Sequence, residues 1–414
     1  MARAALDSSS WRGSRAKRRS LAALIVAQVL ALAPWFSTSA ILPALRAETA
    51  LGDFQGIALT SGVQVGFVLG ALVSALYGLA DRLEPRRLFA LAACVAAGSN
   101  AALLLVDPAG PWAILLRLVT GAAMAGIYPV GMKLAAGWAK GDLGLLVGLL
   151  VGALALGSAS PHLVSALGGI DWRVTILGTS LSALTAALVI GRVERGPAAA
   201  PVRRFVPGAV ALVWRRPALR LVNLGYLGHM WELYALWAWL AVFLEASFRF
   251  HMPVEAARFW GSFATFAAIG LGGLGCVVAG YAADRIGRTA VTAIALAISG
   301  ACALLAGFTF AAAPLLTLSL CLVWGASAIA DSAQFSAATA ELSAPEHVGT
   351  MLTIQTCAGF TLTLVSIHLL PVAADAMGWQ LAPALLAIGP AVGIWAMLAL
   401  RRRPEAVRLA GGRR

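Results

Sequence analysis

Three ionisable side chains lie well inside long apolar runs of this 414-residue chain: Arg117, Glu232 and Asp331. A charge in the middle of a membrane-spanning helix costs roughly 2.5–3.5 kcal/mol on insertion scales, so such residues usually serve a function. A carboxylate that exchanges its proton for a pairing with a cation or a substrate can couple proton movement to transport. We therefore expect these three residues to line a substrate and proton pathway and to neutralise one another in part.

Further polar and aromatic side chains accompany the two carboxylates. His229 precedes Glu232 by three residues and Tyr226 precedes His229 by three, a spacing that places them on one helical face. The other candidates for the pathway are Gln334, three residues after Asp331, with Gln355 and Trp35 in other apolar runs. Structural pairing of the carboxylates, a structural histidine and simple packing of the tryptophan remain the competing interpretations.

The composition places these residues in a membrane protein. The chain is 60% hydrophobic and only 12% charged, whereas a soluble protein carries about 25% charge. Continuous apolar runs of about 20 residues must be helices in a bilayer, because lipid offers backbone groups no hydrogen-bond partner. We predict an all-α polytopic membrane protein with twelve spans, near residues 21–44, 56–80, 88–106, 111–137, 143–167, 173–192, 219–246, 257–283, 289–310, 314–340, 348–371 and 380–400.

The net charge of +13 is distributed by topology. Of the 31 Lys and Arg residues, 26 fall in the two tails and in alternate loops, which the positive-inside rule assigns to the cytoplasm. This predicts cytoplasmic termini and argues against nucleic-acid binding. The expected divisions are a basic tail (1–20), a six-helix bundle (21–192), a cytoplasmic linker (193–218), a second six-helix bundle (219–400) and a second basic tail (401–414).

Metal, disulfide and nucleotide chemistry have no support in the residue pattern. The five cysteines stand singly in apolar runs, and the three lysines, Lys17, Lys133 and Lys140, do not follow glycines as a phosphate-binding loop requires. We expect no cofactor, no metal site and no catalytic residues. Any uphill movement must then be driven by a gradient.

The two predicted bundles repeat one design. Asp81 and Asp284 end the second and eighth runs, 203 residues apart, and "LVTGAAMAGI" from Leu118 matches "LVWGASAIAD" from Leu322, 204 residues apart. Small residues recur every fourth position in several runs, as at Gly62, Gly66 and Gly70, a spacing that lets helices approach closely. The sequence therefore predicts a six-helix unit duplicated in parallel.

The loop after the eighth run carries a recognisable motif. In "AGYAADRIGRTA", Gly280, Asp284, Arg285, Gly287 and Arg288 fit Gly-x-x-x-Asp-Arg-x-Gly-Arg, by which the chain resembles the major facilitator superfamily. The first copy keeps Asp81 and Arg82 but has Tyr77 at the first glycine position, and Glu84-Pro85 replaces the second Gly and its Arg. The fifth run holds only half of the family's exporter motif, with Pro161-His162 where Gly-Pro belongs.

The resemblance implies two parallel six-helix halves that alternately open a central substrate site to either side of the membrane. It also implies that the loop motifs act as a conformational latch, each Asp facing the N-terminus of a helix in the opposite half. For Asp81 the implied partner is the helix start near Gly349, and for Asp284 the start near Asp142. Arg117 and Gly121 match a further family element on the fourth helix.

These patterns predict a monomeric, proton-coupled secondary transporter of a small polar or anionic organic solute, in the inner membrane of a bacterium. It would bind a small molecule, protons and lipid, and would not be an enzyme. Two alternatives stay open. One is proton-driven efflux of an amphipathic compound, favoured by the aromatic seventh run. The other is a transporter-like sensor or membrane-embedded enzyme that moves nothing.

Overall fold

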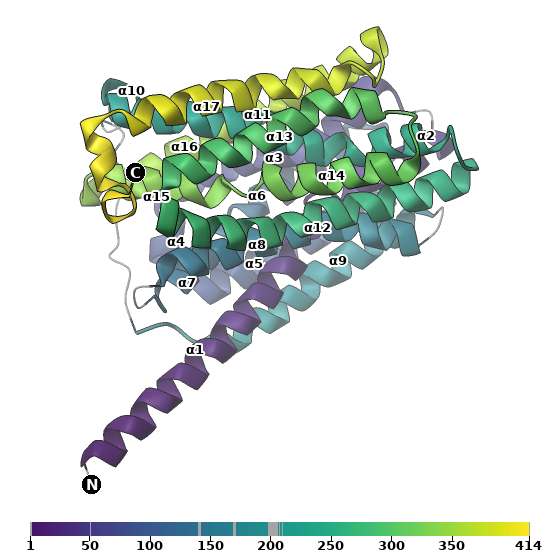
Figure 1. Ribbon diagram of the computed structural model, residues 1–414. Helices are drawn as coiled ribbons and strands as arrows, with labels where there is room; N and C mark the ends of the chain where they lie inside the picture. Colours follow the sequence, from purple (N-terminus) through teal and green to yellow (C-terminus); the bar gives the residue numbers. More distant parts are fainter. Residues whose placement is uncertain are drawn as a thin grey trace.

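The structure is a computed structural model. It describes the chain apart from Met1, Ala50, Lys140, Gly141, Gly169, Ile170, residues 198–205, Pro207, Ala209 and Arg414. Side chains are described from Arg15 onward, with Ala80, Asp81, Leu143 and Pro345 also left out. The described residues contain twelve helices long and apolar enough to cross a membrane, which confirms the predicted number of spans (Figure 1).

The first six spans run from α1 to η2. Their elements are α1 (Ala2–Leu32) with α2 (Ser37–Glu48), α3 (Asp53–Tyr77), α5 (Pro85–Ala101) with η1 (Ala102–Leu105), α6 (Pro111–Met124) with α7 (Tyr128–Ala136), α8 (Leu143–Leu167) and α9 (Trp172–Val189) with η2 (Ile190–Arg192). The short helix α4 (Leu79–Arg82) forms the loop after α3.

The second six spans follow the linker, which contains α10 (Leu212–Arg215). Their elements are α11 (Pro217–Phe248), α12 (Val254–Ile286), α13 (Arg288–Thr309), α14 (Pro314–Ala328) with α15 (Ser332–Leu342), α16 (Val348–Met377), and η5 (Ala382–Ala387) with α17 (Ile388–Arg401). The short helix η4 (Pro345–His347) precedes α16, and η6 (Pro404–Gly412) follows α17.

Proline and glycine set the helix ends. Prolines stand at the first turn of α5, α6, α11 and α14, where a missing N–H costs no hydrogen bond. Gly78, Gly287 and Gly378 follow α3, α12 and α16 with positive φ angles of 62°, 95° and 80°. Such angles strain any residue with a Cβ, so these glycines let the chain leave each helix sharply.

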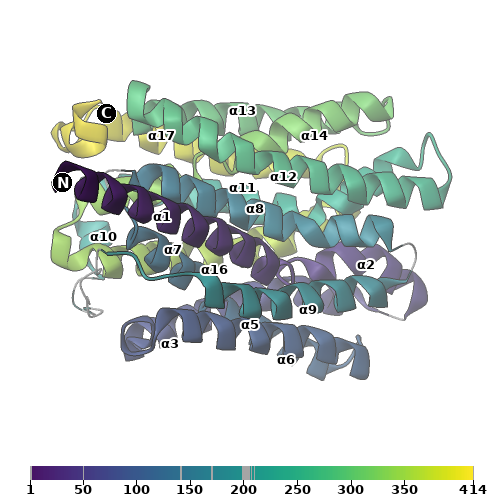
Figure 2. The same ribbon diagram turned by 90° about the horizontal axis from the view of Figure 1, so that it is seen from below.

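The two halves share one packing scheme. In the first half α3 packs on α6, α5 on α9 and α1 on α8. In the second half the corresponding pairs are α12 with α14, α13 with α17 and α11 with α16. Figure 2 shows α3, α5 and α6 on one side of the molecule and α12, α13 and α14 on the other. The fold is therefore the predicted pair of six-helix units.

Two helix pairs make the most extensive contacts between the halves, α8 with α12 and α3 with α16. At the first crossing a Cβ on Gly152 would lie 3.3 Å from the Gly273 carbonyl oxygen, and Gly148 faces the Cys276 carbonyl at 3.8 Å. The crossing is thus backbone against backbone. The glycine repeat of α3 acts within its own half, since a Cβ on Gly66 would collide with the Leu118 carbonyl of α6.

Three spans are interrupted rather than continuous. The first breaks at 33–36, the fourth at 125–127 and the tenth at 329–331. The fourth and tenth breaks are 204 residues apart, the same offset as the repeated sequence, so the interruption belongs to the duplicated design. The first break holds Pro34, which cannot continue the helical hydrogen bonds of α1.

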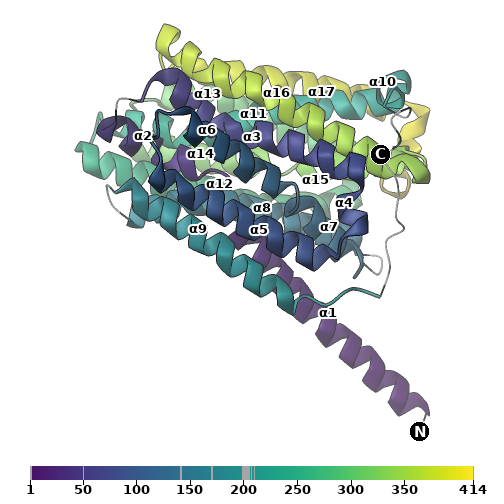
Figure 3. The ribbon, with the colours of Figure 1, turned by 180° about the vertical axis from the view of Figure 1, so that it is seen from behind.

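Both termini lie at one end of the bundle, together with α4, α7 and α10 (Figures 1 and 3). Residues 2–20, which the sequence assigns to a basic tail, continue helix α1 beyond the bundle. The C-terminal segment is docked on the second half: Ala406 and Leu409 are fully buried, and Arg408 donates to the carbonyls of Leu342 and Ser343 at the end of α15.

Candidate functional site

Arg117 is fully buried in the first half, at the break in the first span. Its Nη1 donates to the Pro34 carbonyl (3.0 Å), its Nη2 to the Trp35 carbonyl (2.8 Å) and its Nε to the Leu59 carbonyl (3.2 Å). A broken helix leaves carbonyls without partners at a depth where water is absent, and these must be satisfied by protein groups. Arg117 supplies those donors.

A neutral side-chain network extends from the guanidinium. Asn100 Oδ1 accepts from Arg117 Nη1 (3.0 Å) and from Ser37 Oγ (2.8 Å), while Asn100 Nδ2 donates to Ile176 O and Ser180 Oγ on α9. The network links four helices of the first half around one cation. Sequence reasoning did not single out Asn100, although a lone asparagine in an apolar run was a readable signal.

The structure does not bring Arg117 to the two carboxylates as expected. All hydrogen-bond acceptors of Arg117 that the structure describes are neutral and belong to the first half. Glu232 and Asp331 both belong to the second half and have partners of their own. The physical reason is the break at Pro34. The carbonyls of Pro34 and Trp35 accept hydrogen bonds from the guanidinium, which has five donors, and these bonds hold Arg117 away from the two carboxylates.

Glu232 is held by two neutral donors. Its Oε2 accepts from Ser299 Oγ (2.5 Å) on α13 and its Oε1 from Trp324 Nε1 (2.6 Å) on α14. The side chain is 1% exposed. Both donors come from other helices of the same half, so Glu232 faces the interior of the second bundle. Neither Ser299 nor Trp324 was among the residues expected from sequence.

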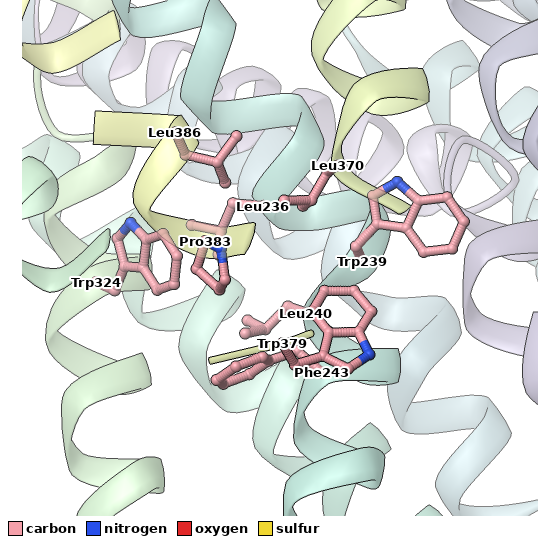
Figure 4. A pocket seen from close by; sticks show the side chains of 9 residues that line it. All are labelled: Leu236, Trp239, Leu240, Phe243, Trp324, Leu370, Trp379, Pro383 and Leu386. Carbon is pink, nitrogen blue, oxygen red and sulfur yellow. The ribbon is translucent and has the colours of Figure 1, made fainter. Parts of the chain in front are cut away.

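The Trp324 indole also borders a small apolar pocket. Figure 4 shows its ring with Trp239, Trp379 and Phe243 around this space. The remaining lining residues are aliphatic, namely Leu236, Leu240, Leu370, Pro383 and Leu386. The pocket lies between α11, α14, α16 and η5, within the second half. Trp324, which donates to Glu232, forms part of its lining.

His229 and Asp331 form a buried ion-pair contact, with Nδ1 2.8 Å from Oδ1 and each side chain 1% exposed. Asp331 is the last residue of the break between α14 and α15, and it caps α15 without a side-chain hydrogen bond. Neither ring nitrogen of His229 and neither carboxylate oxygen makes a hydrogen bond of good geometry within the part of the chain that the structure describes. The structure thus brings together two of the residues predicted from the sequence. Their nitrogen and oxygen atoms remain able to form hydrogen bonds with another group.

Aromatic rings surround this pair. Tyr226 lies 6.1 Å from the His229 ring and 5.9 Å from Phe335, and Phe335 lies 5.6 Å from His229, centroid to centroid. The break itself is fastened by Cys276, whose Sγ lies 3.3 Å from the Ile329 carbonyl as a weak donor. Because Cys276 also lies at the α8–α12 crossing, the break is next to the contact between the halves.

Trp35 belongs to a cluster of aromatic rings at the contact between the two halves. We call the six rings the aromatic plug: Trp35, Phe36 and Phe67 come from the first half, and Tyr234, Trp237 and Phe360 from the second. Trp35 lies 5.6 Å from Phe360, Phe67 lies 4.5 Å from Phe360, and Phe36 lies 5.8 Å from Tyr234. All six are nearly or fully buried. The halves therefore meet here through apolar surface.

Gln334 on α15 and Gln355 on α16 lie apart from the plug. Gln334 Oε1 accepts from Arg288 Nη1 (2.8 Å), and Gln355 Nε2 donates to Thr339 Oγ1 (2.7 Å). Both contacts fasten helices within the second half. The geometry thus links Gln334 to the loop motif rather than to Asp331.

The second loop motif is anchored within its own half. Arg288 forms a two-pronged ion pair with Glu341 of α15 (2.7 and 2.9 Å), and Arg285 stacks on the Tyr281 ring. Asp284 is exposed at the end of α12, and its backbone carbonyl accepts from Arg413. A Cβ on Gly280 would meet no atom within 4 Å, whereas Gly287 requires its positive φ.

The implied partner of Asp284 has another contact in this structure. Asp142, at the start of α8, forms an ion pair with Lys17 of α1 (2.6 Å), which offsets its negative charge. In the first copy of the motif, the side chain of Asp81 lies outside the described residues, and Arg82 is exposed at the end of α4.

In the first copy of the loop motif, Glu84 replaces the second glycine and has a structural role of its own. Glu84 caps α5 by accepting from the Arg87 backbone N–H (2.9 Å) and also accepts from Arg86 Nε (2.9 Å) and Arg195 Nε (3.3 Å). Burial opposes ionisation of this carboxyl, but the donors from Arg86, Arg87 and Arg195 outweigh it and lower its pKa to about 2. Glu84 thereby fastens the segment that follows η2 to the start of α5.

Comparison with known proteins agrees with this architecture. A family model described as Major Facilitator Superfamily matches residues 24–330. A solved structure with a similar fold is that of a bacterial homologue of the human lysosomal transporter Spinster, in an inward-facing and occupied conformation. It has a TM-score of 0.64 and 16% sequence identity, and the match covers 92% of this chain and 96% of that one. The search of curated proteins gives no match.

Proposed function

Because the chain belongs to the Major Facilitator Superfamily, a family of transporters and not of enzymes, we propose that it moves a small polar or anionic organic solute by proton-coupled alternating access. It is an integral membrane protein with twelve spans and a secondary transporter of that fold. The coupling ion and the substrate class are the proposed part. They are supported by the buried titratable groups of the second half.

The His229–Asp331 pair is the observation that carries proton coupling. An imidazole and a carboxylate can each carry a proton, and their contact at 2.8 Å allows one proton to pass between them. The Asp331 oxygens and His229 nitrogens keep hydrogen-bonding capacity that a substrate or a water molecule could use. Its place at a helix break allows the proton state to change the local backbone.

Glu232 has a supporting role in this proposal. Its two oxygens already accept from Ser299 and Trp324, which fix its position between α13 and α14. Glu232 lies one turn from His229 on α11, and Trp324 and Asp331 lie on the two parts of the tenth span. A proton arriving at either carboxylate therefore acts on the same pair of helices.

The halves are built to separate at the aromatic plug and to pivot at the α8–α12 crossing. Apolar rings make few directional bonds, so their separation breaks no hydrogen bond between the halves. The glycine-lined crossing keeps the backbones close while small rotations occur. The opening of one side and then the other is the alternating access that we propose.

We further propose that the end of the bundle bearing both termini is cytoplasmic, that the membrane is a bacterial inner membrane and that the transporter works as a monomer. The basic residues of α1, α4 and the C-terminal segment gather at this end, and excess positive charge marks the cytoplasmic side. Protons and one small solute are then the only partners besides lipid.

The test begins with a thermal-shift screen of the purified protein against a metabolite library, followed by uptake of the best ligand into proteoliposomes. With an inward proton gradient the native protein should accumulate ligand. Asp331→Asn and Glu232→Gln should insert and fold, since an amide lowers the insertion cost, and at least one should lose accumulation while retaining ligand exchange without a gradient. Asp375→Asn, at an exposed carboxylate of α16, is the control and should accumulate normally.

Accumulation that ignores the proton gradient, or that survives in both amide variants, would contradict proton coupling through these groups. If Asp331→Asn loses both ligand exchange and accumulation, Asp331 binds the substrate rather than carrying the proton.

Efflux of an amphipathic compound is the second candidate. Its specific support is the aromatic plug together with the tryptophan-lined pocket, both of which offer flat apolar surface. Reversing the orientation of the proton gradient in the same proteoliposomes separates import from export, because an exporter would deplete the compartment that an importer fills.

A further inference from the structure

Several buried polar atoms at the centre of the molecule have no partner and no part in the proton scheme. His162 on α8 is fully buried, and neither of its ring nitrogens has a hydrogen-bond partner among the described residues. The same holds for the hydroxyls of Ser158 on α8 and Ser39 on α2, and for Nε1 of Trp237 on α11. Unsatisfied buried polar groups are rare in native proteins, and each needs an explanation.

The direction of the two α8 side chains follows from their neighbours, since successive residues of a helix turn by about 100°. Gly157 faces α1, with its Cβ position 2.9 Å from Leu32 Cβ, and Ser165 donates to the Ala40 carbonyl of α2. Gly152, which faces α12, lies about 220° round from Gly157. Measured in the same way from Gly157, Ser158 lies at about 100° and His162 at about 140°. Both side chains therefore point between the first span and α12 and away from Leu156, which is exposed.

Ser39 faces the same interior space from α2. Ser37 points to Asn100 of α5 and Thr38 to the Leu59 carbonyl of α3. Two residues after Ser37, Ser39 is turned by about 200°, roughly opposite α5. The Trp237 ring contacts Phe36, just before α2, at 5.7 Å edge to face. Since Ser165 meets Ala40, the side chains of His162, Ser39 and Trp237 lie at one level of the bundle.

The aromatic plug separates this level from the other unpartnered pair. Trp35 and Tyr234 lie between the two on the first and seventh spans, and His229 and Asp331 lie on the side of the plug nearer the termini. His162 and Ser39 lie on the opposite side. Two sets of unsatisfied polar groups thus flank one apolar barrier.

We infer that His162, Ser39 and Ser158, together with the indole N–H of Trp237 at the edge of the aromatic plug, form a second hydrogen-bonding station for the transported solute, on the far side of the plug from His229 and Asp331. The inference rests on the proposed transport function and adds the recognition chemistry. The station offers two hydroxyls, an indole N–H and an imidazole. Such donors suit acceptor oxygens of a substrate, as in a carbonyl, hydroxyl or carboxylate, next to an apolar body that the plug can hold.

The first test needs no ligand and compares neighbouring serines. Ser37 is hydrogen-bonded to Asn100 and Arg117, whereas Ser39 is unpartnered. Ser37→Ala should lower the thermal unfolding temperature of the purified, ligand-free protein. Ser39→Ala and His162→Leu should leave it unchanged or raise it, because an unsatisfied polar group is removed. If Ser39→Ala and His162→Leu both lower it as much as Ser37→Ala, the groups serve the resting structure and the inference fails.

The second test asks whether the station meets water during the transport cycle. His162→Cys and Ser39→Cys, reconstituted in liposomes, are treated with a charged methanethiosulfonate reagent, and the added mass is measured on the intact protein. Both should gain one reagent group above the native background. Leu156→Cys, on the same helix but 41% exposed and turned by about 120° from His162, should gain none. If neither station cysteine gains mass, the inference is overturned.

The outcomes separate this inference from the proposed function. Unlabelled station cysteines together with normal gradient-driven accumulation would reject the station and retain the proton-coupled transporter. Labelled cysteines together with accumulation that ignores the gradient would retain the station and reject proton coupling.

Discussion

At the scale of single residues, Arg117 shows how a buried charge can serve architecture. Three carbonyls of the first half accept from it, two of them freed by the break at Pro34. The guanidinium is a planar fork, and lysine cannot reproduce its directions. The residue most suggestive of an anion site in the sequence is therefore occupied by the protein itself.

We predict that Arg117→Lys lowers the thermal unfolding temperature of the detergent-purified protein. A carbonyl left without a donor costs about 1–3 kcal/mol. The Trp35 carbonyl depends on Arg117, whereas the Pro34 and Leu59 carbonyls also accept from Ser37 and Thr38. The control is Arg82→Lys, at an exposed arginine of α4, which should unfold like the native protein. Unchanged stability combined with lost ligand binding would return Arg117 to the substrate pathway expected from the sequence.

Glu84 gives a pH-dependent prediction outside the membrane. Its pKa falls from an ordinary value near 4.5 to about 2 in the folded protein. A lowered folded-state pKa contributes stability that is present above about pH 4.5 and is lost as pH falls towards 2. Glu84→Gln should therefore unfold at lower temperature than the native protein at pH 6, and the difference should shrink as pH falls from about 5 to 3. A difference that is constant with pH would show that the hydrogen bonds act independently of the charge.

At the scale of helices, one break in a span could be predicted from the sequence and another could not. Pro34 was a visible signal for the first break, because proline interrupts helical hydrogen bonding. The break before Asp331 has no proline, and it depends on packing against Cys276 and α11. The pairing of His229 with Asp331 could not be read from spacing, since it joins residues 102 positions apart.

The α8–α12 crossing yields a prediction about motion. Gly152→Val should force the two backbones apart, and overpacking of this kind costs about 1–3 kcal/mol. Because the helices belong to different halves, we expect a loss of about tenfold or more in the initial rate of transport. Gly144→Val is the matched control on the same helix, since its Cβ meets no atom within 4 Å.

Equal rates in the Gly152 and Gly144 variants would show that the crossing is not a pivot. Gel filtration of both proteins checks that any loss of rate is not a loss of folded protein.

At the scale of the whole molecule, the sequence predicted the architecture well. Hydropathy placed all twelve spans, and the 203–204 residue offset predicted the pseudo-repeat that the helix pairs now show. These are properties of long segments averaged over many residues. Contacts such as Glu232 with Ser299 and Trp324 depend on the rotation of single helices, which an apolar run leaves undetermined.

The proposed topology can be tested on intact cells. Phe54→Cys lies at an exposed position at the start of α3, 70% exposed, and Val407→Cys lies in the C-terminal segment, 50% exposed. A membrane-impermeant thiol reagent should label Phe54→Cys in intact cells and Val407→Cys only after the cells are opened. The reverse pattern would invert the assignment of the basic end to the cytoplasm.

The Trp324–Glu232 hydrogen bond also gives the molecule an optical property. An indole N–H that donates to a carboxylate experiences its negative charge, and protonation of the carboxylate removes that charge from beside the ring. The ultraviolet emission of Trp324 should therefore change when Glu232 gains a proton. The spectrum of the native protein minus that of Trp324→Phe would isolate this signal from the other twelve tryptophans. The chain thus carries a built-in spectroscopic indicator of charge at one buried site, readable without any label.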